Sequence, residues 1–116
     1  MNHEECVFCQ IIDGSIAGEI IHEENDLVAF KDINPQAPEH ILIIPRKHIT
    51  RLSQTDQEDI PLLGKMLQLA AMLARKNNYT ENGYRIVMNE GKNGGQTVYH
   101  IHLHLMAGRR FIWPPG

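Results

Sequence analysis

The stretch YHIHLHL at residues 99–105 constrains the fold more than any other part of the chain. Its three histidines, His100, His102 and His104, alternate with apolar residues, which is the pattern of a half-buried β-strand. Because successive side chains of a strand point to opposite faces, the imidazoles share one face and the apolar residues share the other, which we expect to be the core. Neighbouring imidazoles then lie about 6.6–6.8 Å apart, so two of them can reach one small anion or one metal ion.

The rest of the chain predicts an α+β domain around this strand. Further strands are expected at IIHE (20–23), LVAF (27–30), HILIIP (40–45) and YRIVMNE (84–90), and helices at 6–13 and about 56–77. Strands that do not alternate with helices favour an antiparallel sheet with the helices on one side. The long helix has one apolar stripe, which consists of Leu62, Leu63, Met66, Leu67, Ala70, Leu73 and Ala74.

Length and charge restrict the class of protein. The 116 residues fit one compact domain, and the net charge of −3, from 11 basic and 14 acidic residues, argues against a nucleic-acid coat while leaving room for a small nucleotide. The first residues have no apolar signal core, and no apolar run reaches transmembrane length. We therefore expect a cytoplasmic protein without membrane or nucleic-acid partners, whose two cysteines are thiols or metal ligands.

A glycine-rich loop, GKNGGQT at residues 91–97, leads into the histidine strand. Glycines allow close approach of a ligand to the backbone, and Thr97 adds a hydroxyl. Since the ordinary pKa of histidine is near 6.5, one imidazole at pH 7 can be a neutral nucleophile while another is a cation that holds phosphate oxygens. Zinc binding by a His-x-His pair is the competing interpretation.

Beyond this motif, several blocks resemble one known family. The His-apolar-His-apolar-His pattern is similar to the signature of the histidine triad (HIT) superfamily. FKDINPQAPEHILIIPRKHI, GYRIVMNEG, GGQTVYHIHLHLMAGR and the terminal WPPG resemble its Hint branch of purine nucleoside phosphoramidases, over almost the whole chain. The resemblance implies one HIT domain over residues 1–116. It also implies a homodimer whose sheet continues across the subunits through the YRIVMNE strand and the long helix.

The resemblance further implies a reaction. Hint-like enzymes hydrolyse the P–N bond of purine nucleoside 5′-monophosphoramidates through a covalent nucleotidyl-histidine, releasing AMP or GMP and an amine, and they need no cofactor for catalysis. By similarity, His102 is the nucleophile and His104 holds the phosphate oxygens. His40 and His100 support the nucleophile, and Thr97 replaces a serine that hydrogen-bonds the leaving group.

The nucleoside site is implied in the same way. Asp32 matches the carboxylate that binds the ribose hydroxyls, and backbone N–H groups of the glycine-rich loop help to hold the phosphate. The full set of expected nucleotide contacts is Phe8, Ile11, Phe30, Asp32, Ile33, Asn89, Gly95, Gln96, Thr97, His102 and His104. Residues 107–116 form a tail near the active site of the partner subunit, where Trp113 contacts the substrate.

Cys6 and Cys9 depart from the pattern of many Hint-like proteins. Other bacterial members of the superfamily carry Cys-x-x-Cys here and bind zinc, and in this chain the matching ligands are Cys6, Cys9, His48 and His100. Two sulfur and two nitrogen ligands make a closed structural zinc site. The alternative is that both cysteines are plain thiols.

Three other functions remain open at this stage. The first is a dinucleoside polyphosphate hydrolase with the same nucleophile, which the WPPG tail and the GGQTVYH context disfavour. The second is a zinc-stabilised, non-catalytic dimer that binds nucleotides. The third is a zinc hydrolase with His102 and His104 as ligands, although the chain contains no helical His-Glu metal motif.

Overall fold

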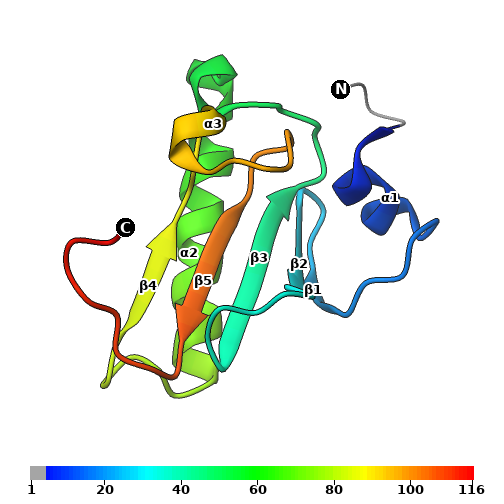
Figure 1. The fold of residues 1–116 in the computed structure, drawn as a ribbon. Helices are drawn as coiled ribbons and strands as arrows, with labels where there is room; N and C mark the ends of the chain where they lie inside the picture. The colour runs from blue at the N-terminus through cyan, green and yellow to red at the C-terminus, as the bar shows by residue number, and fades with distance from the viewer. Residues whose placement is uncertain (1–4) are drawn as a thin grey trace.

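The histidine stretch leads into β5, the strand between β3 and β4 in a five-stranded antiparallel sheet (Figure 1). The computed structural model describes residues 5–116. Its strands lie in the order β1-β2-β3-β5-β4, and every neighbouring pair is antiparallel. Their bounds are β1 Ile20–Glu23, β2 Leu27–Lys31, β3 Glu39–Pro45, β4 Tyr84–Val87 and β5 Leu103–Ala107. The predicted α+β fold with an antiparallel sheet is confirmed.

The helices are α1 (Val7–Asp13), α2 (Ile60–Lys76) and the short α3 (Gly91–Gly94), with single 3-10 turns at Leu52–Gln54 and Gln57–Asp59. The start of α1 is capped by the Cys6 side chain, which accepts a hydrogen bond from the Cys9 N–H. Its end is Gly14, whose φ of 84° lies in the left-handed region that glycine adopts without strain. The expected helices at 6–13 and 56–77 are thus confirmed with slightly shifted ends.

The two main helices cover opposite faces of the sheet, so the expectation that helices lie on one side is wrong. The core under α2 contains Leu27, Ala29, Ile41, Ile43, Leu103 and Leu105 from the strands. The residues that alternate with them, Val28, Phe30, Leu42 and Ile44, pack instead against Phe8 and Ile11 of α1. Strands with apolar side chains on both faces need a cover on each side, and the short helix α1 supplies the second one.

The buried stripe of α2 differs from the predicted stripe at two residues. Met66, Ala70, Leu73 and Ala74 are buried as expected, and Leu62 and Leu63 pack against the edge of the same core. Leu67 is 53% exposed, whereas Leu69, which the predicted stripe omitted, is buried. The reason is the helical repeat, since Leu69 lies between Met66 and Leu73 on one face and Leu67 is turned away from them.

Regular strand β5 begins later than predicted, after His100 and His102. The ladder pairs Ile43 with Leu103, and continuing the same register would place Pro45 opposite Ile101. Proline has no N–H to donate, and the Ile101 N–H instead donates to the Ile49 carbonyl at 2.7 Å. The alternation of faces is kept, because Ile101 lies in the same core cluster as Leu103 and Leu105.

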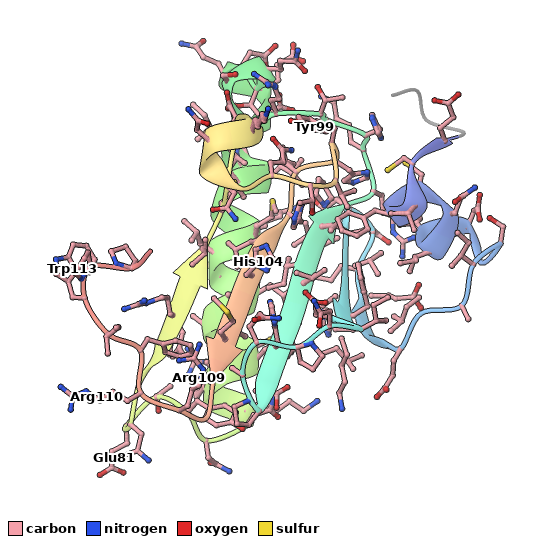
Figure 2. All side chains as sticks on the ribbon, viewed as in Figure 1. Glu81, Tyr99, His104, Arg109, Arg110 and Trp113 are labelled. Carbon is pink, nitrogen blue, oxygen red and sulfur yellow. The ribbon has the colours of Figure 1, made fainter. Side chains whose placement is uncertain are left out.

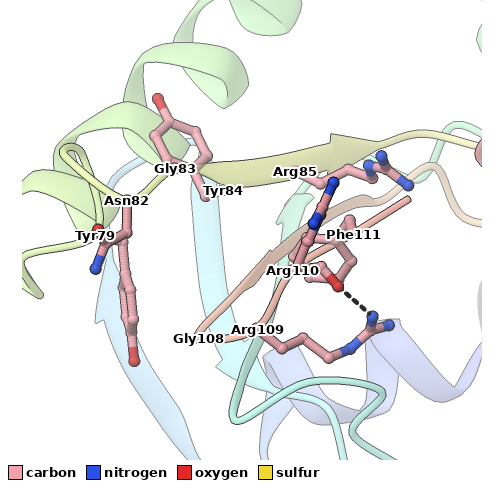
Figure 3. Close-up of a pocket in the computed structure, with 9 residues that line it drawn as sticks. All are labelled: Tyr79, Asn82, Gly83, Tyr84, Arg85, Gly108, Arg109, Arg110 and Phe111. Atoms are coloured by element: carbon pink, nitrogen blue, oxygen red, sulfur yellow. Dashed lines mark hydrogen bonds between the residues drawn. The ribbon is translucent and has the colours of Figure 1, made fainter. Parts of the chain in front are cut away.

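The tail after β5 crosses β4 and extends beyond that edge of the sheet (Figure 1). Two arginines contact the ring of Phe111, with guanidinium carbons 4.2 Å (Arg109) and 5.2 Å (Arg85) from its centroid. Arg85 also donates a hydrogen bond to the Ile112 carbonyl at 2.9 Å. These side chains border a hollow of about 540 Å³ between the tail and the turn before β4 (Figure 3). The tail is therefore held to β4 up to Ile112.

Within the described part of the chain, no helix has the length and apolar character that crossing a membrane requires.

Candidate functional site

A pocket of about 410 Å³ opens on the face of the sheet that α1 covers. It has the size of a small-molecule site. The lining includes nine of the predicted residues: Phe8, Ile11, Phe30, Asp32, Ile33, His40, Thr97, His102 and His104. His104 lies near the middle of the sheet, on β5 (Figure 2). Residues from α1, β2, β3 and the histidine stretch thus converge on one cavity.

His102 is buried at this pocket with one ring nitrogen already used. Its Nδ1–H donates to the carbonyl oxygen of His100 at 2.8 Å. A neutral imidazole carries one hydrogen, so the other nitrogen, Nε2, keeps its lone pair. Burial lowers the pKa of His102, which keeps the ring neutral at pH 7. The ring therefore has the tautomer that a nitrogen nucleophile requires.

A hydrogen-bonded chain gives His104 the opposite arrangement. The Gln36 N–H donates to His40 Nδ1 at 3.0 Å, so the hydrogen of a neutral His40 is on Nε2. That nitrogen lies 2.8 Å from His104 Nδ1 and donates to it. The hydrogen of His104 is then on its own Nε2, where it is available to an acceptor such as a phosphate oxygen. Neighbouring rings thus offer a lone pair on His102 and an N–H on His104.

The expectation of one cationic imidazole is not met in the ligand-free pocket. Burial, reinforced by the nearby His102 and His40, lowers the pKa of His104 to about 4. Burial also lowers the pKa of His40, with Asp32 acting in the opposite direction. All three rings are therefore neutral at pH 7, and the orientation of their hydrogens distinguishes their roles.

Asp32 both closes a turn and lines the pocket. Its Oδ1 accepts a hydrogen bond from the Asn34 N–H at 2.8 Å, which closes a turn after β2. Its Oδ2 lies 3.4 Å from His40 Nε2, and the side chain lines the pocket. A carboxylate in this position can accept hydrogen bonds from hydroxyl groups of a ligand.

The apolar wall contains two aromatic rings, those of Phe8 and Phe30, among aliphatic side chains. Phe8 meets Phe30 edge to face with centroids 5.4 Å apart, and meets His102 in the same way at 5.0 Å. Ile33 is 96% exposed at the mouth. Sequence reasoning missed the rest of the lining, which is Val7, Ile16, Ala17, Gly18, Lys31, Asn34, Gln36, Leu42 and Val98. One of them is Gly18, where the structure shows that a Cβ would meet Ile11 Cγ2 at 2.8 Å.

The glycine-rich loop supports the site differently from the prediction. Residues 91–94 form α3, and the backbone N–H groups of Gly95 and Gln96 donate to Lys92 and Gly91 carbonyls within the loop. The buried Gln96 amide donates to the carbonyls of Thr50 and Val98 and accepts from the Gly91 N–H. Gly95, Gln96 and Asn89 do not line the pocket, and of the predicted loop contacts only Thr97 does. The loop braces the site and leaves these N–H groups unavailable to a phosphate.

A second cluster lies behind Phe8. Cys6, Cys9, His48 and His100 each place one ligand atom within 4.8 Å of the others. The Sγ atoms of Cys6 and Cys9 are 3.4 and 3.5 Å from His100 Nδ1, and Cys9 Sγ is 3.3 Å from His48 Nδ1. Around tetrahedral zinc, Zn–S and Zn–N bond lengths place sulfur and nitrogen ligands about 3.6 Å apart. The four residues therefore fit a structural zinc ion, as their types predicted.

His100 accordingly belongs to the metal cluster and does not line the pocket. Its Nε2–H donates to the Pro45 carbonyl at 2.7 Å, which leaves Nδ1 free of hydrogen and facing both sulfurs. This is the usual support for a metal-binding histidine. Burial and the neighbouring Cys6 raise the pKa of Cys9 to about 12, so this thiol keeps its proton until a metal displaces it.

Trp113 lies far from the pocket of its own chain. The side chain is 83% exposed, on the part of the tail that extends past β4 (Figure 2). This position leaves it available to a second molecule at the β4 edge.

Comparison with known proteins agrees with this geometry. A family model described as the HIT domain matches residues 13–111. The chain belongs to the HIT family. The matched residues include the pocket histidines, whereas Phe8 and Ile11 of the pocket and the cysteine pair of the metal cluster precede them.

Relatives of this HIT protein carry informative names. A 14 kDa zinc-binding protein of Zea mays is 45% identical over 112 residues, covering 95% of this chain and 87% of the relative. A HIT family hydrolase of Legionella pneumophila is similar in structure, with a TM-score of 0.94, 47% identity and coverage of 97% and 100% of the two chains. A histidine triad nucleotide-binding protein of Candida albicans matches with a TM-score of 0.81 and 31% identity, covering 97% and 85%.

Proposed function

We propose that this HIT protein hydrolyses purine nucleoside 5′-monophosphoramidates through a covalent nucleotidyl-histidine. The observation that carries the proposal is the pairing of a lone pair on His102 with an N–H on His104 at the inner end of one pocket. The names of the relatives, hydrolase and nucleotide-binding protein, support the general class.

The proposed reaction has two steps. His102 Nε2 attacks the α-phosphorus, a new N–P bond forms, and the P–N bond to the amine breaks as the amine takes up a proton from solvent. Water then attacks the phosphorus, the His102–phosphorus bond breaks, and the nucleoside monophosphate is released. His104 Nε2–H donates to a phosphate oxygen, and the Thr97 hydroxyl at the rim reaches the leaving amine. No step requires a metal ion.

The substrate orientation follows from the lining. The aromatic wall of Phe8 and Phe30 suits a purine ring, and Asp32 suits the ribose hydroxyls. In the proposed orientation the sugar lies between the base wall and the histidines, and the 5′-phosphate reaches His102. Each of these contacts is part of the proposal.

We also infer a homodimer. β4 is an edge strand, so one side of it is unpaired within the protomer, and the exposed apolar residues Ile60 and Leu67 lie on α2. The tail extends past the same edge, which suits a role of Trp113 at the neighbouring subunit. A cytoplasmic location agrees with cysteines that serve as metal ligands.

The decisive experiment uses zinc-loaded protein and a fluorogenic adenosine phosphoramidate. We expect turnover by the wild type, an adenylyl adduct on His102 detected by mass spectrometry after acid-free quenching, and loss of both in His102→Ala with AMP binding retained. His22→Ala, which changes a surface histidine paired with Glu24, is the matched control and should keep full activity. Turnover that survives in His102→Ala would refute the nucleophile assignment.

The alternatives give different results in the same assay. A dinucleoside polyphosphate hydrolase would cleave diadenosine polyphosphates with a higher kcat/KM than the phosphoramidate. A zinc hydrolase would form no adduct, and a non-catalytic protein would bind AMP without turnover. Asp32, His40 and His104 also lie close enough to hold a metal, so the adduct separates nucleophilic from metal-dependent hydrolysis.

A further inference from the structure

Helix α1 belongs to both the metal cluster and the nucleotide pocket. Cys6 and Cys9 are members of the cluster, while Val7 and Phe8, the two residues between them, line the pocket. Ile11, one turn further on, lines it as well. The Cys-x-x-Cys spacing therefore places the two metal-binding sulfurs and part of the base wall on the same turn of helix.

Phe8 makes the connection between the sites directly. Its ring lies 5.9 Å from the ring of His100, a member of the cluster, and 5.0 Å from the ring of His102. It also contacts Phe30 of the base wall. A displacement of Phe8 would therefore change the wall of the pocket and the packing on the nucleophile together.

The position of α1 depends on contacts with distant parts of the chain. A seven-residue helix is not stable alone in water. The sulfur contacts tie it to His48, 39 residues away, and to His100, 91 and 94 residues away. A bound metal would replace these weak contacts with four coordinate bonds, which would fix α1 against the segment after β3 and the histidine stretch.

His100 provides a second connection through the backbone. Its ring is held on both nitrogens, by the sulfurs at Nδ1 and by the Pro45 carbonyl at Nε2. The carbonyl oxygen of the same residue accepts the hydrogen bond that orients His102. Metal binding to His100 thus restrains the peptide group that anchors the nucleophile.

We propose that metal occupancy of the Cys6/Cys9/His48/His100 cluster and nucleotide binding in the pocket are coupled, with α1 as the shared element. The proposal rests on the proposed nucleotide site. Because coupling between two binding events is reciprocal, zinc raises the affinity for AMP by the same factor by which AMP raises the affinity for zinc. We expect a factor of about ten, within the usual range of such couplings.

The test compares His48→Asn with His22→Asn. His48 belongs to the metal cluster and does not line the pocket, whereas His22 is a surface histidine of β1. AMP affinity is measured by calorimetry at limiting and at saturating Zn²⁺. At limiting Zn²⁺ we expect about tenfold weaker AMP binding in His48→Asn, restored at saturating Zn²⁺, and wild-type behaviour throughout in His22→Asn.

A reciprocal measurement uses the wild-type protein alone. Zinc affinity is determined by competition with a chromogenic chelator, with and without saturating AMP, and we expect AMP to tighten zinc binding by the same factor. Far-UV circular dichroism of the stripped protein should keep the sheet signal.

Each outcome decides between the proposals. Equal zinc affinity with and without AMP overturns the coupling and leaves the proposed function intact. Loss of the sheet signal on stripping also overturns it, since the metal would then support the whole fold and not α1 alone. Absence of AMP binding in both zinc-loaded and stripped protein overturns the coupling and the proposed function together.

Discussion

At the scale of single residues, three neutral imidazoles have different functions because their hydrogens are placed differently. The His100 carbonyl sets the tautomer of His102, and a chain that starts at the Gln36 N–H sets that of His104. A neutral N–H donor avoids the free-energy cost of burying a cation beside two other histidines. The site therefore does not need the charged ring that the ordinary pKa of histidine led us to expect.

The lowered pKa values predict how stability changes with pH. His104 has a pKa of about 4 when folded, below its ordinary value of 6.5, so between these values the unfolded state binds more protons. The free energy of unfolding should therefore fall as the pH drops from 7 to 4. Urea unfolding at several pH values should show a shallower fall for His104→Asn than for the wild type, because His40 and His102 still contribute. Identical slopes would contradict the assignment, since the metal cluster is the same in both proteins.

A substitution at Gly18 should alter the pocket, and the same substitution at a second glycine serves as its control. A Cβ at Gly18 would meet Ile11 Cγ2 at 2.8 Å, so Gly18→Ala should displace Ile11 and weaken AMP binding severalfold. Gly64 lies in α2 with no atom within 4 Å of the added carbon, so Gly64→Ala should raise the free energy of unfolding by about 0.5–1 kcal/mol. AMP titrations and urea unfolding of both variants test the pair. Unchanged AMP affinity in Gly18→Ala would show that Ile11 is not a ligand contact.

At the scale of elements, the strands and the buried face of the long helix could be predicted, because each follows a repeating pattern of apolar residues. Alternation located the strands and kept Ile101, Leu103 and Leu105 in one core, although Pro45 shortened the regular ladder. The spacing of apolar residues predicted the buried face of α2 except at Leu67 and Leu69.

Features that depend on tertiary contacts could not be predicted from sequence patterns. Whether the N–H groups of the loop are free to bind a ligand depends on hydrogen bonds such as those of Gln96. Whether a helix covers the second face of the sheet depends on where α1 docks. The alternating pattern and the glycine-rich loop pointed to His102, His104 and Thr97. The other predicted residues found in the pocket came from the resemblance to the HIT family, because an isolated Phe8 or Asp32 has no functional pattern of its own.

The attachment of the tail to β4 gives a prediction at the same scale. Arg85 contacts Phe111 and bonds the Ile112 carbonyl, so Arg85→Ala should loosen the segment that carries Trp113. Trp113 is the single tryptophan of the chain, and its fluorescence anisotropy should fall in this variant. Arg75→Ala, in the last turn of α2, is the matched control and should leave the anisotropy unchanged. Equal values in all three proteins would exclude Arg85 as the anchor.

At the scale of the whole molecule, the two edges of the sheet differ. In the proposed dimer the β4 edge and the exposed Leu67 of α2 face the second copy, and the tail extends past that edge (Figure 1), whereas β1 forms the opposite edge. An unpaired strand next to exposed apolar side chains favours association with a second copy.

Because the two edges of the sheet differ, a charge introduced near one edge should change the oligomeric state, and a charge near the other should not. Leu67→Glu should convert a dimer into a monomer, because a carboxylate buried at the interface would have no partner. Ile20→Glu places the same charge on the β1 edge and should leave the dimer intact. Sedimentation equilibrium at micromolar concentration distinguishes the two species. A monomeric wild type, or a dimeric Leu67→Glu, would contradict the proposed interface.

The long separation in sequence between α1 and its histidine contacts also has a consequence for how the molecule is made. During synthesis Cys6 leaves the ribosome 94 residues before His100, its contact in the metal cluster. Contacts across so long a chain form late, because the intervening segment must be ordered before they become favourable. Helix α1 is thus made before its partners but docks late, and the ligand cavity is completed only after the histidine stretch has emerged.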